Sequence, residues 1–371
     1  MRILTDQQIF SLQQYGGISR YFSEVIKGIN QTPGFQTIPK KIFSNNQHLV
    51  EKKQAFFPFL KSVNKLYKGR VGKHINKIQR RKEFSRLKRG EFDVFHPTYY
   101  DTEFLEFINP SKPFVITVHD MIHELYYNSS DMEQWESINK KKLIPLANHI
   151  IAVSKNTKDD ILKLFPAISP ERITVIYHGP SISVRENSIR TDKSSSKYIL
   201  FVGKRSYYKN FSWLINSASS AIIEKDLHII CAGGGPFTED EIQLLYTNRL
   251  TDRVSFTPIK NDDELMSLYM QALCLLYPSL YEGFGIPILE AFACGCPAIV
   301  CRSSCLPEVG GNAVLYFAKE NPDELVQALR QITEDEGLRT HLIDAGYNRL
   351  KLFSWKKSVE QHCGIYQLVQ N

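Results

Sequence analysis

The sequence predicts an α/β protein with two doubly wound parallel sheets. Its 371 residues exceed the size at which a single hydrophobic core stops growing, so two domains are expected. Short apolar runs alternate with segments of helical periodicity, as parallel strands joined by crossover helices require. This alternation occurs twice, on either side of a Ser-rich, charged stretch at 185–197. We therefore expect Rossmann-like domains over 1–185 and 186–354 that face a central cleft.

In the first domain, the apolar runs are predicted to be short buried strands that end in polar residues. Helical periodicity is found near 18–29 and over 156–165. The predicted strands cover residues 2–5, 92–96, 113–119, 149–154 and 173–177.

The second half restarts with a strand over 197–203 and repeats the pattern. Pro322 follows Asn321 with acids beside it, which is a typical helix start. The acidic run at 262–264 precedes another helical pattern, and we interpret it as the N-cap. The further predicted strands cover 227–233, 253–257, 272–278, 297–301 and 313–317, and helices are expected through 213–214, at 240–246 and at 265–271.

The composition is that of a soluble globular protein. Hydrophobic residues make up 43% of the chain and charged residues 23%, which excludes a disordered tail, a collagen-like chain and a coiled coil. No stretch approaches the roughly 18 uninterrupted apolar residues of a membrane-spanning helix. Asp6 interrupts the N-terminus before a secretory signal can form. We therefore expect a cytoplasmic protein, with peripheral attachment to the inner face of a membrane as an open alternative.

The cysteine usage predicts free thiols. The seven cysteines form no repeated framework, as expected in a reducing compartment. Cys294, Cys296, Cys301 and Cys305 are close in sequence, but their spacing lacks the paired knuckles of structural zinc sites. We interpret them as small buried side chains rather than as metal ligands.

The net charge of +7 comes from one segment. Residues 61–90 carry twelve Lys or Arg against a single acid, Glu83, and their apolar residues recur roughly at helical spacing. One interpretation is an amphipathic helix that binds an anionic membrane surface or a phosphate-bearing partner. The other is a solvated charged helix beside the core. No nucleic-acid reading motif accompanies the charge, so no nucleic-acid partner is predicted.

The strongest motif reads SLYEGFGIPILEA, at 279–291, and follows a predicted strand. Its two carboxylates, Glu282 and Glu290, are separated by seven residues. Between them is a turn that opens a helix, and the free N–H groups and dipole of a helix start favour a phosphate. The two carboxylates would accept hydrogen bonds from hydroxyl groups on both sides of that phosphate. An ordinary helix with an N-terminal acid is the alternative. The turn consists of Gly283, Phe284 and Gly285.

A second motif follows the first predicted strand of the second half. Arg205 and Lys209 flank a loop at the carboxyl end of that strand, just after Gly203, where doubly wound sheets bind ligands. Fixed cations there would stabilise negative charge on a bound group. Two solvated basic residues on a turn are the alternative.

The N-terminal half contributes weaker signals. Gly16 and Gly17 precede a helix, where a backbone without side chains can approach a phosphate or sugar closely, although a plain turn has the same pattern. His119 ends an apolar strand and lies four residues before His123, a spacing also found in zinc-binding pairs. The metalloprotease order is absent, so a metal is disfavoured. We interpret His178 as part of a hinge.

With these motifs the chain resembles the family-4 retaining glycosyltransferases of the GT-B fold. The likeness is strong from about residue 197 to 317 and includes the phrase LPEVGG at 306–311. The likeness is absent from 35–90, the region in which members of the family usually recognise the acceptor. The resemblance implies that Glu282 contacts the donor sugar and Glu290 the ribose hydroxyls, and that the amides of the turn between them face the sugar or phosphates.

The resemblance also assigns roles outside that motif. It implies that Arg205 and Lys209 hold the diphosphate and that His119 reaches the donor sugar. The Gly16–Gly17 loop would contact the donor and shape the acceptor site. A C-terminal helix over about 355–371 would pack back on the first domain.

The reaction implied by the family moves a hexose from a nucleotide-diphosphate sugar to a hydroxyl and keeps the anomeric configuration. A phosphate oxygen of the leaving group would take the acceptor proton in a same-face displacement. No carboxylate pair is placed as in retaining glycosidases. No metal and no cofactor are expected, so the donor is a substrate and not a bound group.

The phrases GGISRYF and YKNF look like those of bacterial polysaccharide mannosyltransferases. We therefore predict GDP-mannose as donor, with UDP-hexoses next. The predicted acceptor is a growing O-antigen, capsule or exopolysaccharide chain on a lipid carrier. Phosphorolysis with the same donor machinery and a non-catalytic nucleotide-sugar-binding protein are the alternatives.

Overall fold

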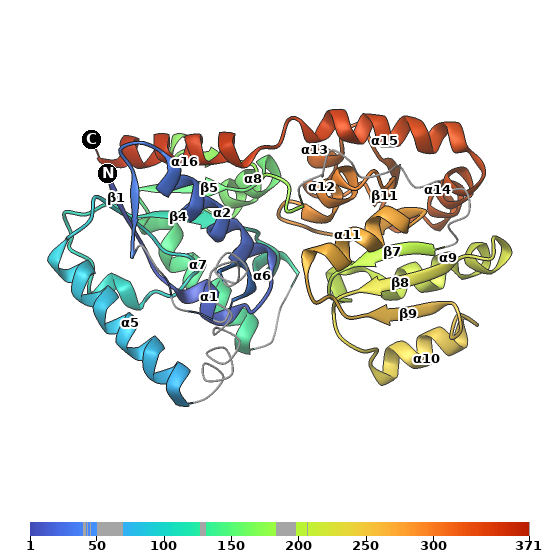
Figure 1. Ribbon diagram of the computed structural model, residues 1–371, viewed down its shortest axis with the longest axis horizontal. Coiled ribbons are helices and arrows are strands. Elements are labelled where there is room, and N and C mark those ends of the chain that lie inside the picture. Colours follow the sequence, from blue (N-terminus) through green and yellow to red (C-terminus); the bar gives the residue numbers. More distant parts are fainter. Residues whose placement is uncertain are drawn as a thin grey trace. The chain divides into compact units, whose positions relative to one another are not determined.

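The computed structural model describes residues 1–39, 42, 44, 46–49, 70–126, 131–182, 198–205 and 207–370. The chain divides into two compact units (Figure 1). Unit 1 comprises Met1–Gly179 together with Ser354–Asn371, and unit 2 comprises Pro180–Phe353. The division therefore lies a few residues before the predicted boundary at 185/186. The predicted linker at 185–197 is outside the described residues.

Unit 1 contains two three-stranded parallel sheets with strand orders β2-β1-β3 and β4-β5-β6. A parallel bridge between Phe95 and Phe114 joins β3 to the segment that leads into β4. Because the pairing is parallel, the carboxyl ends of the strands lie at one edge. The strands are β1 (Arg2–Thr5), β2 (Gln36–Ile38), β3 (Val94–His96), β4 (Val115–Val118), β5 (His149–Ala152) and β6 (Ile173–Val175).

The helices of unit 1 include the C-terminal helix of the chain, α16, which packs on α2 (Figure 1). A side chain at Gly28 of α2 would come within 2.3 Å of Val359 of α16, so glycine allows the two helices to approach closely. The described helices of the unit are α1 (Gln8–Leu12), α2 (Gly17–Gln31), α5 (Arg70–Arg89), α6 (Ile122–Leu125), α7 (Asp131–Leu146), α8 (Lys155–Leu164) and α16 (Trp355–Gln370), with 3₁₀ turns η1 (Glu103–Glu106) and η2 (Pro170–Arg172).

A buried hydrogen-bond network ties α16 to the sheet. The Tyr21 hydroxyl of α2 lies 2.6 Å from His362 Nε2 and 3.0 Å from Thr117 Oγ1. His96, at the end of β3, lies 2.8 Å from the Tyr366 hydroxyl through Nδ1 and 3.0 Å from Thr117 Oγ1 through Nε2. Each of the side chains named here has a hydrogen-bond partner, which offsets the cost of its burial.

The basic segment forms α5 where it is described. Residues 61–69 lie outside the described part, and α5 begins at Arg70. Its apolar side packs on unit 1, since Leu87 is fully buried and Phe84 stacks on Phe107 with ring centres 4.3 Å apart. Lys77, Arg81 and Lys88 are exposed. The helix is therefore amphipathic, and both interpretations of its charge remain open.

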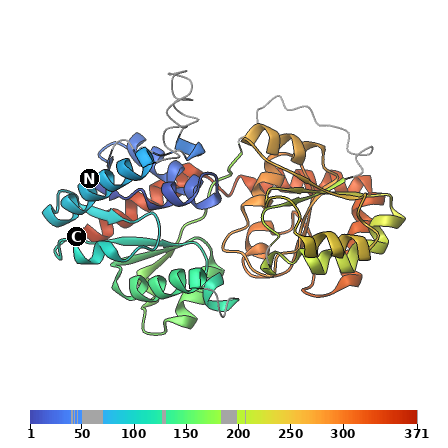
Figure 2. The ribbon, with the colours of Figure 1, turned by 90° about the horizontal axis from the view of Figure 1, so that it is seen from below.

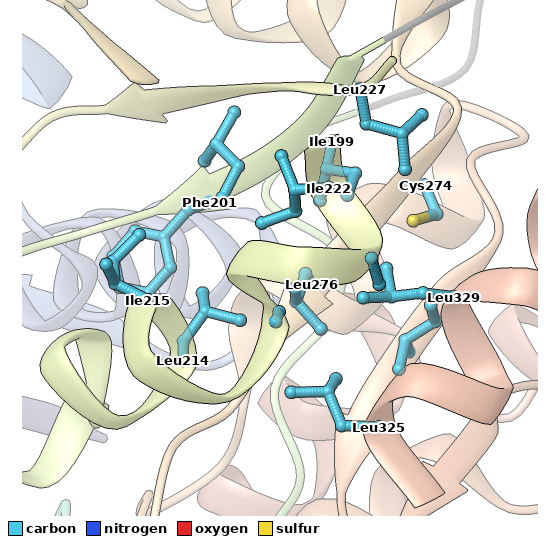
Figure 3. Close-up of a cluster of buried hydrophobic side chains, with 14 of the residues drawn as sticks. Ile199, Phe201, Leu214, Ile215, Ile222, Leu227, Cys274, Leu276, Leu325 and Leu329 are labelled. Atoms are coloured by element: carbon cyan, nitrogen blue, oxygen red, sulfur yellow. The ribbon is translucent and has the colours of Figure 1, made fainter. Parts of the chain in front are cut away.

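Unit 2 has one six-stranded sheet in the order β12-β11-β10-β7-β8-β9, all pairs being parallel. Apolar side chains of its strands pack against α9 and α14, as Figure 3 shows for Ile199, Leu214 and Leu329. The strands are β7 (Tyr198–Val202), β8 (His228–Ala232), β9 (Val254–Thr257), β10 (Cys274–Tyr277), β11 (Ala298–Cys301) and β12 (Leu315–Phe317).

Helices enclose the sheet of unit 2, as the view from below shows (Figure 2). Several begin at a side-chain cap, among them α14 at Asn321 as predicted. At α11 the cap is Asn261, so the interpretation of the acids at 262–264 as the N-cap is wrong: they form the first turn, where they face the positive end of the dipole. The helices are α9 (Phe211–Glu224), α10 (Glu239–Thr247), α11 (Asp262–Gln271), α12 (Ile286–Ala293), α13 (Leu306–Gly310), α14 (Pro322–Glu334) and α15 (Glu336–Leu350), with the 3₁₀ turn η3 (Tyr207–Lys209).

None of the described helices combines the length and the apolarity needed to cross a bilayer. The strand predictions agree with the observed strands to within a few residues, and β2 is the strand that the sequence did not reveal. It has only three residues, two of them polar, which is too short for an apolar pattern to emerge.

Candidate active site

The carboxyl ends of β7 and β10 define the candidate site of unit 2. The strand order reverses between these neighbours, since β8 and β9 continue the sheet beyond β7, and β11 and β12 continue it beyond β10. Ligands of open doubly wound sheets bind at such a switch point, in the crevice outside the strand ends. Gly203 directly follows β7, and the 279–291 motif follows β10.

Lys209 and Glu282 form a largely buried ion pair at this point. Lys209 Nζ donates to Glu282 Oε1 at 2.5 Å and to the Tyr277 hydroxyl at 3.1 Å. The two charged side chains are only 11% and 13% exposed. Burial and the Glu282 charge raise the pKa of Tyr277 well above its usual range, so the hydroxyl stays neutral. The structure thus brings together the cation and the carboxylate of two separate sequence motifs.

Gly203 keeps the space beside the ammonium group open. Its φ of +112° is one that other residues rarely adopt. A Cβ atom here would lie 3.8 Å from both Cε and Nζ of Lys209. Glycine at this position therefore serves both the backbone turn after β7 and access to Lys209.

The loop after β11 holds the loop after β10 in place. The Glu282 backbone N–H donates to Ser304 Oγ at 3.0 Å, and Cys305 Sγ donates to the Glu282 carbonyl at 3.0 Å. Ser303 Oγ donates to the Ser279 carbonyl at 2.7 Å. Burial, with the Glu282 charge, raises the pKa of Cys305 well above its usual range, so the thiol remains a donor. These bonds fix the backbone from which the Glu282 carboxylate projects.

The turn after Glu282 opens α12 as the sequence predicts. Gly285 is the N-cap with φ of +92°, and a Cβ there would lie 3.0 Å from Leu306 Cδ2. Phe284 is buried and packs edge-to-face on Phe353 with ring centres 5.9 Å apart. In the sequence, Gly283 separates Glu282 from Phe284. A glycine cap has no side chain to satisfy the first helix amides, which suits a start that faces an anion.

Glu290 lies in the second turn of α12 and is almost completely buried. The Tyr269 hydroxyl of α11 donates to Glu290 Oε2 at 2.9 Å. Burial and the Glu290 charge raise the pKa of Tyr269 well above its usual range. The hydrogen bond from Tyr269 of α11 thus holds the Glu290 carboxylate in position. Its contact with ribose hydroxyls stays a prediction.

Arg205 forms a buried ion pair with Glu241. Its Nε and Nη2 atoms donate to the two carboxylate oxygens of Glu241 at 2.8 and 3.1 Å, and Nη2 also donates to the carbonyls of Gly235 and Pro236, each at 2.9 Å. The guanidinium lies 4.6 Å from the centre of the Phe237 ring, and the side chain is 3% exposed. These bonds hold the turn after β8, and binding of a diphosphate by Arg205 would require some of them to break, so its role on the donor stays a prediction.

Lys204 is the exposed basic residue beside Arg205. Among the described residues, no hydrogen bond or ion pair joins Arg205 to Lys209 or Glu282. Lys204 and Arg205 are adjacent cations in the sequence. Only the packing of Phe237 and Glu241 in the structure shows that Arg205 is the buried one.

His119 follows β4 in unit 1 and is 7% exposed. Its backbone N–H donates to the Tyr100 hydroxyl at 3.0 Å, while Nε2 has no hydrogen-bond partner among the described residues. Burial, with the charge of Lys140, lowers the pKa of His119 to about 3. The ring is therefore neutral near pH 7 and can exchange a hydrogen bond with a hydroxyl, but it cannot supply a positive charge to a phosphate.

Gly16 and Gly17 lie at the start of α2, as predicted for a turn before a helix. Gly16 is the N-cap in an extended conformation, so its backbone imposes no need for glycine. A Cβ on Gly16 would lie 2.5 Å from Gln13 Oε1, so a side chain here would displace the end of the Gln13 side chain. That oxygen accepts from the Ser19 N–H at 3.1 Å and caps the helix.

The other histidines and the cysteines show no grouping for a metal. Within the described ranges, no three His, Cys, Asp or Glu side chains are placed to hold one ion. His123 Nδ1 lies 3.1 Å from Glu136 Oε2. None of the seven cysteines, all of which the structure describes, forms a disulfide, and Cys294 alone among them is partly exposed. His178 packs near Trp355, and a side chain at Gly179 would lie 2.5 Å from the Trp355 backbone nitrogen.

Sequence reasoning missed Tyr277, Ser304 and Cys305. Tyr277 was hidden in an apolar strand, and the other two were assigned no role. One signal could have found them: residues 303–305 directly follow the strand that pairs with β10, so they share its carboxyl edge.

Two family models match the chain. "Glycosyltransferase Family 4" matches residues 52–183, and "Glycosyl transferases group 1" matches residues 184–349. The two matches adjoin and together span most of the chain. They also meet close to the division between the two structural units.

Curated relatives agree with the models. An uncharacterized glycosyltransferase, MJ1607 of Methanocaldococcus jannaschii, is 28% identical over 59% of this chain and 60% of its own length. The O-antigen chain mannosyltransferase RfbU of Salmonella typhimurium is 33% identical over 56% of this chain and 57% of its own length. The chain thus spans less than two thirds of these two relatives. Others, at 22–27% identity, are named mannosyltransferases and D-inositol 3-phosphate glycosyltransferases.

The fold also has solved counterparts. The sucrose-phosphate synthase of Thermosynechococcus elongatus superposes with a TM-score of 0.68 at 17% identity, covering 99% of this chain and 98% of the other. The architecture is the two-domain GT-B fold, as the sequence predicts. The chain belongs to the family-4 glycosyltransferases.

Proposed function

We propose that this glycosyltransferase moves a hexose, with mannose of GDP-mannose first among the candidates, to a hydroxyl of a lipid-linked or growing cell-surface polysaccharide. The observation that carries the proposal is the Lys209–Glu282 pair at the switch point of unit 2. The mannosyltransferase names among the relatives support the choice of sugar. UDP-hexoses are the alternative donors.

The ion pair prepares the site for an exchange of partners. A diphosphate carries more negative charge than one carboxylate, so it competes with Glu282 for the Lys209 ammonium. Glu282 then needs new donors, because an unpaired buried carboxylate is costly. Hydroxyl groups of the donor sugar supply them. The same substrate thus satisfies both members of the pair.

Lys209 also acts on the leaving group. In the proposed same-face displacement, the bond from the sugar's anomeric carbon to the β-phosphate oxygen breaks as the bond to the acceptor oxygen forms. The acceptor proton passes to a phosphate oxygen of the departing diphosphate. Lys209 and the amides at the start of α12 stabilise the negative charge that develops there. His119, neutral and unpartnered at Nε2, is assigned a hydrogen bond to a donor-sugar hydroxyl.

The first experiment measures donor cleavage. Purified protein is incubated with GDP-, UDP-, ADP- and dTDP-sugars in EDTA, and released nucleotide is quantified. We expect one sugar nucleotide to be cleaved, and Lys209→Ala to abolish cleavage. Lys260→Ala, on an exposed lysine of the same unit, is the matched control and should cleave as the native chain does.

The outcomes separate the alternatives. No cleavage and no calorimetric nucleotide binding would refute the proposed function. Nucleotide binding without cleavage, even with saccharide acceptors added, would indicate a non-catalytic binding protein. Activity that is lost in EDTA and restored by Mg²⁺ would contradict metal independence. The anomeric configuration of the product, read by NMR, tests retention.

We also propose that α5 attaches the enzyme peripherally to an anionic membrane surface. Its exposed lysines and arginines, including Lys77, Arg81 and Lys88, supply the charge. Co-sedimentation with phosphatidylglycerol vesicles should weaken when these three are replaced by Gln. Unchanged sedimentation would refute membrane attachment through α5 and favour the interpretation of α5 as a solvated charged helix.

A further inference from the structure

A pocket lies in unit 1, lined by the carboxyl ends of β1 and β2 and by α5. Its volume is about 360 Å³, which lies in the usual range for a small-molecule site. The end of β1 contributes residues 4–7, the end of β2 contributes Pro39, and α5 contributes residues between 78 and 86. The position matches the edge of the sheet where doubly wound folds bind ligands.

The pocket has an apolar portion formed by three aliphatic side chains. Leu4 and Ile42 are buried beneath it, while Ile78 of α5 remains 40% exposed. An exposed isoleucine beside a concave surface leaves apolar area for a ligand to cover. The ring carbons of a sugar offer a matching apolar face.

Several polar groups at the pocket lack partners within the described part of the chain. Thr5 is 2% exposed, and its Oγ1 makes no hydrogen bond. The buried Oε1 of Gln7 also has no partner, although Nε2 of the same amide donates to the Asn76 carbonyl at 3.2 Å. Polar atoms are rarely buried without a partner unless a ligand or water satisfies them.

Two carboxyl groups extend this pattern. Asp6 Oδ1 accepts from the hydroxyl and the N–H of Thr98 and from the N–H of Gln8, so its hydrogen bonds all fall on one oxygen. No described residue forms a hydrogen bond with the Glu83 carboxyl. Burial, with the charge of Asp6, raises the pKa of Glu83 to about 9, and burial raises that of Asp6 to about 6. Glu83 is therefore largely protonated near pH 7 and can both donate and accept.

We propose that this pocket binds a hexopyranose ring of the acceptor saccharide, through its aliphatic portion and the free polar atoms of Thr5, Gln7 and Glu83. The proposal rests on the proposed transferase function, which needs a second substrate beside the donor. A wholly apolar ligand would leave these polar atoms unpaired, which disfavours it. Lys82 and Arg86 also line the pocket, beside Asp6 and Glu83, so the lining carries both signs of charge and favours neither a cation nor an anion. A neutral polyhydroxyl ring satisfies both halves of the lining.

The test measures sugar binding to the full chain by saturation-transfer NMR. The probe is methyl α-D-mannopyranoside, without nucleotide, and cadaverine and inorganic phosphate serve as charged comparisons. We expect the glycoside to bind and both charged probes to fail. Thr5→Val removes one hydroxyl at nearly constant shape and should weaken glycoside binding about two- to tenfold, as the loss of one hydrogen bond does. Glu83→Gln keeps a donor and an acceptor at this position and should retain most of the binding.

Thr247→Val, at an exposed threonine of α10 in unit 2, is the matched control and should bind the glycoside as the native chain does. Because Thr5 Oγ1 has no partner, Thr5→Val should melt no lower than the native protein, so a loss of binding would not reflect unfolding. Equal binding by all variants, or no binding by the native chain, would overturn the proposal. Preferential binding of cadaverine would point instead to an amine site.

These results are independent of donor cleavage. A chain that cleaves its donor but shows no glycoside binding refutes the pocket and leaves the proposed function intact. A chain that binds the glycoside but neither binds nor cleaves any sugar nucleotide refutes the proposed function. In that case the pocket would be a sugar site without an assigned acceptor role.

Discussion

The candidate site of unit 2 and the pocket of unit 1 handle their polar groups in opposite ways. In unit 2, the Lys209 ammonium and the Glu282 carboxylate satisfy each other at 2.5 Å. In unit 1, the hydroxyl of Thr5 and the amide oxygen of Gln7 satisfy nothing among the described residues. A ligand of the first site must replace an existing interaction and therefore has to be charged. A ligand of the pocket in unit 1 gains hydrogen bonds without breaking any between protein groups, so a neutral ligand suffices.

The largest expected effect comes from breaking the pair on its acidic side. Glu282→Gln should lower transfer about 10²–10³-fold, because the donor sugar loses a charged hydrogen-bond acceptor. It should also tighten the binding of free GDP, since Lys209 is no longer neutralised. Turnover and calorimetric affinity for GDP are measured on the same preparations. Glu239→Gln, on an exposed glutamate of α10, is the control. Weaker GDP binding in Glu282→Gln would contradict the exchange of partners.

The next effect tests the supporting pair in unit 2. Glu241→Gln leaves the guanidinium of Arg205 buried without its carboxylate, and removing one member of such a pair costs about 3–5 kcal/mol. The melting temperature should fall markedly. Replacing both Arg205 and Glu241 by Met should cost less than the single change, since no charge is left unpaired. A double variant less stable than Glu241→Gln would mean that the charges themselves hold the turn after β8.

The two regions also differ in how far the sequence reveals them. Glu282, Glu290 and Lys209 follow predicted strands, and the carboxyl edge of a parallel sheet is where such strands must present their loops. Their meeting at one switch point follows from the strand order, which the alternation of strands and helices favours but does not specify. The pairing of Arg205 with Glu241 could not be predicted, because Phe237 and Glu241 come from a later loop and helix.

The pocket of unit 1 has no such signature. Thr5 ends an ordinary apolar strand, and β2 is too short to be recognised, so the sequence does not show that their ends line a cavity. Glu83 is embedded in a run of basic residues and looks solvated there. The burial of Glu83 depends on how α5 packs on the sheet. The periodicity of the sequence does not predict that packing. Partner-free polar atoms are a property of packing and are visible only in the structure.

The pocket further predicts a pH effect on stability. The pKa of Glu83 is raised to about 9 by burial, then by Asp6, against a usual value of 4.5, while Arg80 acts in the opposite direction. The folded chain therefore binds a proton that the unfolded chain releases above about pH 5, and stability is lost as the pH rises towards 9. Glu83→Gln removes this loss. Relative to the native chain it should gain stability as the pH rises from about 5.5 to 8.5, by up to about 1.4 kcal/mol for each pH unit.

Thermal melts of both proteins at the two pH values measure this difference. Glu91→Gln, on an exposed glutamate just after α5, is the control and should show no such trend. A gain that is equal at both pH values would mean that Glu83 is ionised in the folded chain, which would also weaken its assignment as a hydrogen-bond donor in the pocket.

The smallest expected effect concerns the support behind Glu282. Ser304→Ala removes the acceptor for the Glu282 N–H, a bond of 3.0 Å, and should cost about 0.5–1.5 kcal/mol of stability. The carboxylate itself is untouched, so the consequence for catalysis is positional: turnover should fall severalfold while the affinity for free GDP, which depends on Lys209, stays unchanged. Ser354→Ala, which removes a longer 3.5 Å contact to a helix N–H, is the comparison. If Ser304→Ala changed GDP affinity as much as turnover, the loop after β11 would support the phosphate-binding cation as well as the carboxylate, and the two members of the pair would not be separable.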